Sequence, residues 1–89
     1  DAIGLGVIAT ARELGLVVPR DLSVVGYNDQ PFAAQCDPPL TTVDSRRRAL
    51  ARAAVEMLLS LSAGHSPGQT RILDCRLVLR ATTAPPPVS

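Results

Sequence analysis

Apolar residues near the start of the chain recur at helical spacing, which predicts a helix over residues 2–15. The side chains that form this single apolar stripe are Ile3, Val7, Ala11 and Leu14. Asp1 can cap the start of the helix, and Gly15 suits the left-handed conformation that often follows a helix end. We therefore expect the chain to open with an amphipathic helix.

The next apolar runs are shorter and contain β-branched residues, a pattern typical of strands. It predicts a buried strand over residues 22–27, a short strand over 41–43 and a final strand over 72–79. Three prolines between residues 30 and 40 exclude a continuous helix or a central strand there.

Helical spacing returns after the second predicted strand. Asp44 or Ser45 can cap a helix that runs to about Ala63. The stripe on this helix comprises Leu50, Ala54, Val55, Leu58, Leu61 and Ser62. Residues 65–70 predict a polar turn, and the prolines in residues 81–89 predict a loose tail. The order helix, strand, strand, helix, strand predicts half of an α/β sheet, a partial domain over residues 1–80.

Composition narrows the class of protein. The chain has 89 residues, a net charge of +1 and an apolar fraction of 46%, so charge alone indicates neither nucleic acid nor a membrane surface. All nine basic residues are arginines. Cys36 and Cys75 lack the spacing of metal ligands, which favours two free thiols but leaves a disulfide open. No apolar run approaches the ~18–20 residues of a membrane span.

Asn28 and Asp29 are the best candidates for contacts with a ligand. They follow the predicted strand directly, and ligands of open α/β sheets bind beyond the carboxyl ends of the strands. Amide and carboxylate groups can make paired hydrogen bonds with the vicinal hydroxyls of a sugar. The alternative is a turn role, since both residue types readily bond their own backbone.

The segment from Gly4 to Ala9 matches the dinucleotide pattern G-x-G-x-x-G/A, with Asp29 at a suitable distance beyond it. That motif requires a preceding strand, whereas helical periodicity has already begun at Ile3. Close helix packing is therefore the favoured role of these glycines. The sequence also offers no nucleophile with a matching base, so we expect no enzyme activity.

Three consecutive arginines, Arg46 to Arg48, stand at the start of the second predicted helix. The helix dipole disfavours cations at this end. A solvated face offset by Asp44 is the simpler interpretation. The sharper one is that one arginine faces a cleft and binds an anionic group on a ligand.

Four blocks occur together in order: DAIGLG from Asp1, RELGLVVPRDLSVVGY from Arg12, DPPLTTV from Asp37 and RATTAPP from Arg80. Together they resemble the C-terminal part of the effector-binding core of the LacI family of transcriptional regulators. The resemblance implies a periplasmic-binding-protein-like type I fold, in which two α/β subdomains enclose an effector. This chain would form most of the C-terminal subdomain, a mostly parallel sheet flanked by helices.

The resemblance also implies a function. We expect a sugar-sensing, homodimeric part of a cytoplasmic repressor that needs no cofactor and reaches operator DNA only through an N-terminal domain outside this chain. The alternative is a periplasmic sugar-binding component of a transporter, because the two groups share the fold.

The implied ligand contacts are Asn28, Asp29, Leu50 and Arg47, and the implied dimer contacts are Leu5, Ile8, Phe32, Gln35 and Cys36. Asn28 stands where the family has an acidic residue, Ser45 replaces a frequent glutamine and Arg47 replaces an often apolar residue. These departures imply an unusual effector. We also expect the isolated chain to be a piece of a longer protein, marginally stable and prone to associate through an exposed strand edge.

Overall fold

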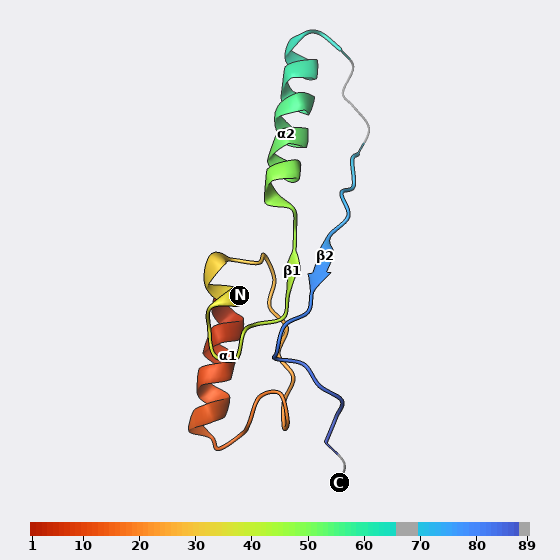
Figure 1. Ribbon diagram of the computed structural model, residues 1–89. Coiled ribbons are helices and arrows are strands. Elements are labelled where there is room, and N and C mark those ends of the chain that lie inside the picture. Colours follow the sequence, from red (N-terminus) through yellow and green to blue (C-terminus); the bar gives the residue numbers. More distant parts are fainter. Residues whose placement is uncertain (66–69, 88–89) are drawn as a thin grey trace.

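The computed structural model describes residues 1–65 and 70–87. Its elements, in chain order, are the helix α1 (Ala2–Glu13), a 3₁₀ turn η1 (Pro31–Ala34), the strand β1 (Thr42–Asp44), the helix α2 (Arg47–Ser62) and the strand β2 (Arg76–Val78). Helix α1 and the loops around it form one end of the molecule, and α2 projects away at the other (Figure 1). The radius of gyration is 18.3 Å, whereas a compact domain of this length has about 12 Å.

Strands β1 and β2 pair antiparallel, with Thr42 opposite Val78 and Asp44 opposite Arg76. Val25 adds one parallel bridge to Thr41. The helices and the small sheet confirm the α/β class. The predicted mostly parallel sheet is wrong for the described residues, because their one ladder is antiparallel and parallel pairing is confined to this bridge. The predicted strand 72–79 shortens to the three residues of β2.

The segment predicted as a buried strand, residues 22–27, is extended but bonded mainly along one edge. Val24 N donates to Thr82 O and Gly26 N to Thr41 O, both at 2.9 Å. On the other edge, the described residues supply one bond, from the backbone nitrogen of Asp1 to Tyr27 O at 3.1 Å. Because that edge lacks a neighbouring strand here, Val25 remains 53% exposed and the segment is only partly buried.

The core gathers around Leu40, which is fully buried and packs in one cluster with Ile8, Val24 and Ala33. A Cβ on Gly4 would lie 3.4 Å from Leu40 Cδ2, so this glycine sits in close contact with the core. Helix α1 has already begun at Ala2, and no strand precedes the glycine motif in the described residues. The close packing expected for both glycines is therefore confirmed for Gly4 and wrong for Gly6, where an added Cβ would meet no atom within 4 Å.

The start of the predicted loose tail is firmly attached, which corrects that expectation for residues 81–84. Thr82 is fully buried; its hydroxyl accepts a hydrogen bond from Thr41 N at 2.9 Å and donates one to Val24 O at 2.6 Å. Ala84 N donates to Ser23 Oγ at 3.1 Å. A polar residue in a proline-rich stretch gives no sequence signal for such long-range bonds.

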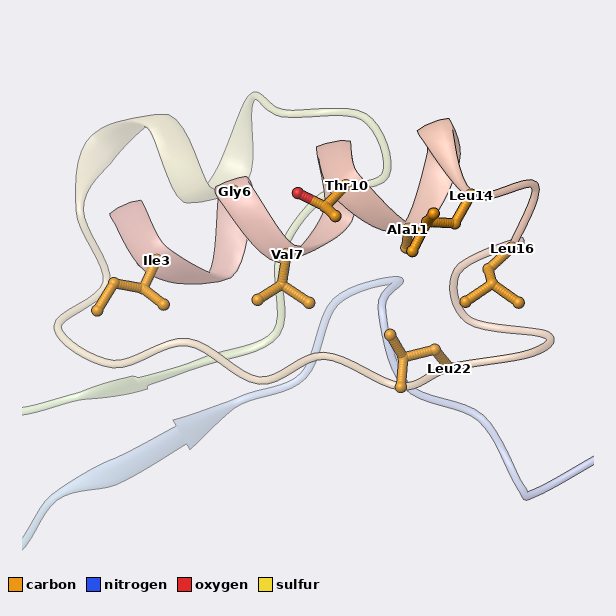
Figure 2. Close-up of a pocket in the computed structure, with 8 residues that line it drawn as sticks. All are labelled: Ile3, Gly6, Val7, Thr10, Ala11, Leu14, Leu16 and Leu22. Atoms are coloured by element: carbon orange, nitrogen blue, oxygen red, sulfur yellow. The ribbon is translucent and has the colours of Figure 1, made fainter.

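Much apolar surface is left uncovered. A hollow of about 510 Å³ runs between α1 and the segment around Leu22, and apolar side chains point into it from both sides (Figure 2). Its lining residues are Ile3, Gly6, Val7, Thr10, Ala11, Leu14, Leu16 and Leu22. On α2, Leu58 and Leu59 are more than half exposed.

No described helix is both long and apolar enough to cross a membrane. Both cysteines are free thiols.

We expect the isolated 89-residue chain to associate and to unfold without a sharp transition. The reason is that exposed apolar side chains such as Ile3, at 84%, favour contacts between copies. Light scattering after size-exclusion chromatography and scanning calorimetry would measure this. A monodisperse monomer with a cooperative melting transition would contradict the expectation.

Thr82→Val should destabilise the complete protein that contains this chain by about 1–3 kcal/mol, because it leaves a buried donor and a buried acceptor unpaired. Urea unfolding curves would measure the change in the free energy of unfolding. Thr83→Val is the matched control, since no hydrogen bond of its side chain is found among the described residues; it should change stability by less than about 0.5 kcal/mol. Equal effects of the two substitutions would refute the assigned role of the Thr82 hydroxyl.

Candidate ligand-binding site

The chain turns sharply at Asn28 and Asp29, where the extended segment ends. Both residues have positive φ angles, 104° and 49°. Asn and Asp are the non-glycine residues that tolerate this region best. Asn28 N donates to Val43 O at 2.7 Å, which holds the turn beside β1. The turn role is thus confirmed, and it coexists with the placement of both residues at the end of the extended segment.

One of the two polar atoms of the Asn28 side chain is hydrogen-bonded within the described residues. Its Oδ1 accepts a hydrogen bond from Ser45 Oγ at 2.9 Å. The part of the chain that the structure describes supplies no acceptor for Asn28 Nδ2. The amide therefore retains a donor that can bind a hydroxyl or carbonyl oxygen of a ligand.

Asp29 is held by an ion pair. Its Oδ1 lies 2.7 Å from Arg80 Nη2, and the two side chains are 27% and 18% exposed. Arg80 also donates to Leu40 O at 2.9 Å, and its backbone nitrogen donates to Thr41 Oγ1 at 2.9 Å. A charge-assisted bond at this distance fixes the carboxylate. Asp29 consequently serves first to fasten the turn to the core and only second as a possible ligand contact.

The carboxylate of Asp1 fastens the same turn from another direction. It accepts hydrogen bonds from Gln30 N and from Thr42 Oγ1, and makes no side-chain capping bond to α1. Asp1 is therefore the N-cap residue of α1, as predicted, but its side chain bonds to the turn and not to the helix. Gly26 permits this approach, since a Cβ there would collide with the Asp1 carboxylate and lie 2.8 Å from Leu40 Cδ2.

The arginine run begins α2. Arg46 is the N-cap residue and has a left-handed backbone, with φ of 56°. Asp44 accepts from Arg46 N at 2.8 Å and pairs with Arg76 at 3.4 Å. The helix thus starts after Arg46 rather than after Asp44 or Ser45. The Ser45 hydroxyl is directed to Asn28 instead of to the helix.

The four predicted ligand contacts are only partly brought together. Asn28 and Asp29 share one turn, and Ser45 joins them. Arg47 follows two residues later and lines a hollow of about 670 Å³ at the start of α2. Leu50 does not line that hollow and is 54% exposed, one turn further along the helix.

The predicted dimer contacts differ in accessibility. Leu5 and Gln35 are exposed, whereas Phe32 and Cys36 are half-buried. Ile8 is 4% exposed and packs against the chain's own core, which corrects its assignment to an interface. A side chain with so little free surface has almost no area to offer a partner.

Sequence reasoning missed Arg80 and the carboxylate role of Asp1. Arg80 is separated from Asp29 by 51 positions, so no local pattern links them. Among the described residues there is no group of three side chains that could hold a metal ion.

Two pKa shifts concern exposed groups. Contact with Cys75 raises the pKa of the Tyr27 hydroxyl, and hydrogen bonds from Arg52 and Arg71 lower the pKa of Glu56. Both groups are open to solvent, which screens their interactions.

Comparison with known proteins extends this picture. A model of the periplasmic binding protein-like domain matches residues 1–83. The transcriptional repressor CytR of Escherichia coli K12 is 38% identical over 93% of this chain and 25% of its own length. The regulator MalR of Streptomyces coelicolor is 46% identical over 98% of this chain and 26% of its own. A Lac repressor dimer bound to operator and the anti-inducer ONPF superimposes with a TM-score of 0.87 and 40% identity, over 93% of this chain and 29% of that one.

The chain therefore belongs to the periplasmic binding protein-like domain family. Within that class its relatives are LacI-type transcriptional regulators, as the sequence blocks predict. The chain spans about a quarter of the length of the curated relatives that it matches.

A double-mutant cycle in the complete protein would test the Asp29–Arg80 pair. Asp29→Asn and Arg80→Gln should show a coupling energy of about 1.5–3 kcal/mol, because the bond is charge-assisted and shielded. Free energies of unfolding of the four proteins provide the measurement.

The exposed pair of Arg52 and Glu56, 3.1 Å apart on α2, is the control. Its coupling should be clearly smaller, since solvent and salt screen it. Equal coupling in the two pairs would show that Arg80 does not fasten the turn.

Proposed function

We propose that this chain is the effector-sensing and dimerising part of a LacI-type transcriptional regulator. The observation that supports it most is the Asn28 amide, which is fixed at the end of the extended segment with one donor still available. The chain is also similar to transcriptional regulators, one of which was solved with operator and an anti-inducer. This similarity supports a role for the amide in binding an effector. The effector is a sugar or a related small polar molecule, and no cofactor is needed.

The bonds around the turn suggest how binding is transmitted. The turn is fastened to the start of α1 and to β1 through Asp1, and to the core through Arg80. A ligand that binds Asn28 therefore acts on a turn that several elements share. If the ligand binds one arrangement of the two subdomains more tightly, it shifts the population towards that arrangement and changes operator affinity.

Asn28 also bears on the choice of ligand. The Asn28 amide can form hydrogen bonds with hydroxyl groups of a ligand. These bonds are weaker than those that a charged carboxylate side chain would accept at the same position. Asp29 cannot replace that charge fully while Arg80 pairs with it at 2.7 Å.

The partners follow from the same proposal. A second copy contacts the surface of Leu5, Phe32, Gln35 and Cys36, and operator DNA is bound by an N-terminal domain outside this chain. The protein acts in the cytoplasm and is not an enzyme. The transporter alternative is not favoured, because the relatives described above are transcriptional regulators.

Operator binding by the complete protein, measured with and without a panel of sugars, would test the proposal. One sugar should change the operator affinity. Asn28→Gly, which removes the amide but keeps the positive φ angle, should weaken the binding of that sugar by about tenfold while leaving sugar-free operator binding unchanged. Asp74→Ala, an exposed position elsewhere, is the control and should behave like the unaltered protein.

Two results would contradict the proposal. One is that no sugar in the panel changes operator affinity; the other is that Asn28→Gly and Asp74→Ala act alike. The coding sequence upstream of Asp1 provides a separate check. A helix-turn-helix segment there agrees with the regulator, whereas a secretory signal without one supports the transporter.

A further inference from the structure

The hollow at the start of α2 is strongly positive. It has a volume of about 670 Å³, within the range of small-molecule sites. Its lining contains four arginines and one carboxylate: Asp44, Arg46, Arg47, Arg48, Ala49 and Arg52. Its lining residues follow β1 and begin α2, and Figure 1 shows this junction between the two ends of the molecule.

The positive charge is not neutralised from within. Asp44 already accepts from Arg46 N and pairs with Arg76 outside the hollow. Arg52 pairs with Glu56. In the described part of the chain, the guanidinium groups of Arg46, Arg47 and Arg48 have no hydrogen bond or ion pair. Three adjacent cations are therefore available to an external anion.

The helix start adds to this charge. Helix α2 has 16 residues, no acidic residue in its first turn and no side-chain capping bond. Its first backbone N–H groups thus point out of the helix without a side-chain acceptor, and cations at this end are unfavourable. An oxyanion in the hollow would offset both effects, and guanidinium groups match the geometry of phosphate and carboxylate oxygens.

The hollow adjoins the candidate ligand turn. Val43 O accepts from Asn28 N at 2.7 Å, and Ser45 Oγ donates to Asn28 Oδ1 at 2.9 Å. Arg46 and Arg47 follow Ser45 directly in the chain. Only Ser45 separates β1 from these arginines in the chain, so the turn and the hollow are neighbours, although neither Asn28 nor Ser45 lines the hollow itself.

We propose that the effector carries an oxyanion group, a phosphate ester or a carboxylate, that Arg47 and its neighbours bind while Asn28 holds its hydroxyl part. This inference rests on the proposed function and adds a ligand class to it. The sugar and its anionic substituent are one molecule that spans the turn and the helix start.

The test uses the complete protein, titrated by calorimetry with inorganic phosphate and with glucose, glucose 6-phosphate and glucuronate as matched probes. Inorganic phosphate should bind measurably at low salt and more weakly as salt rises. Arg47→Gln and Arg48→Gln should each weaken the affinity for phosphate by about tenfold. Arg20→Gln removes the same charge from an exposed position paired with Asp21 and should leave binding unchanged.

The probe pairs then identify the source of the oxyanion. Tighter binding of glucose 6-phosphate than of glucose supports a phosphate ester, and tighter binding of glucuronate supports a carboxylate. If phosphate does not bind, or if Arg47→Gln and Arg20→Gln weaken it equally, the proposal is overturned.

Operator binding keeps the two proposals distinct. A neutral sugar that changes operator affinity, with no anion bound, overturns the oxyanion site and leaves the regulator intact. Phosphate bound through Arg47, with no neutral or anionic compound of a broad panel affecting the operator, supports the site and counts against the regulator.

Discussion

Leu40 is the contact on which the rest of the structure depends. It is fully buried between α1, the extended segment and η1, and it reaches this position because Gly4 and Gly26 present no side chains there. Apolar burial of this kind is the main favourable term in folding. The next residue, Thr41, bonds to the extended segment and to Thr82. Packing at one leucine thus sets the position of β1, and β1 leads directly into α2 and its arginines.

The polar turn uses its side chains for structure before any ligand arrives. Asp29 is paired with Arg80, and Asp1 is bonded to the turn and to Thr42, so charges from distant parts of the sequence hold one short loop. Such pre-organisation lowers the conformational cost of binding a ligand. It also divides the labour between neighbours: Asn28 keeps a donor available, whereas Asp29 is mainly committed to the fold.

The exposed apolar surface is spread over α1, the extended segment, α2 and the residues around β2. These are the faces that the described residues leave without a partner. Helix α2 illustrates the physical point, because it makes few contacts with the other elements although its leucines repeat at helical spacing. In an elongated chain of this size, the apolar side chains cannot all reach a common core. A helix can therefore form locally while its apolar side chains stay exposed.

The sequence by itself determined the class, both helices, the turn at Asn28 and the packing role of Gly4. These follow from periodicity, from turn chemistry and from motifs, which act over a few neighbouring residues. Only the tertiary structure decided that Asp29 is neutralised by Arg80, that Thr82 is buried and that Ile8 faces the core. Those outcomes depend on contacts between residues far apart in the chain, and a strand becomes a full strand only where a neighbour supplies its hydrogen bonds. Patterns of neighbouring residues in the sequence cannot predict such distant partners.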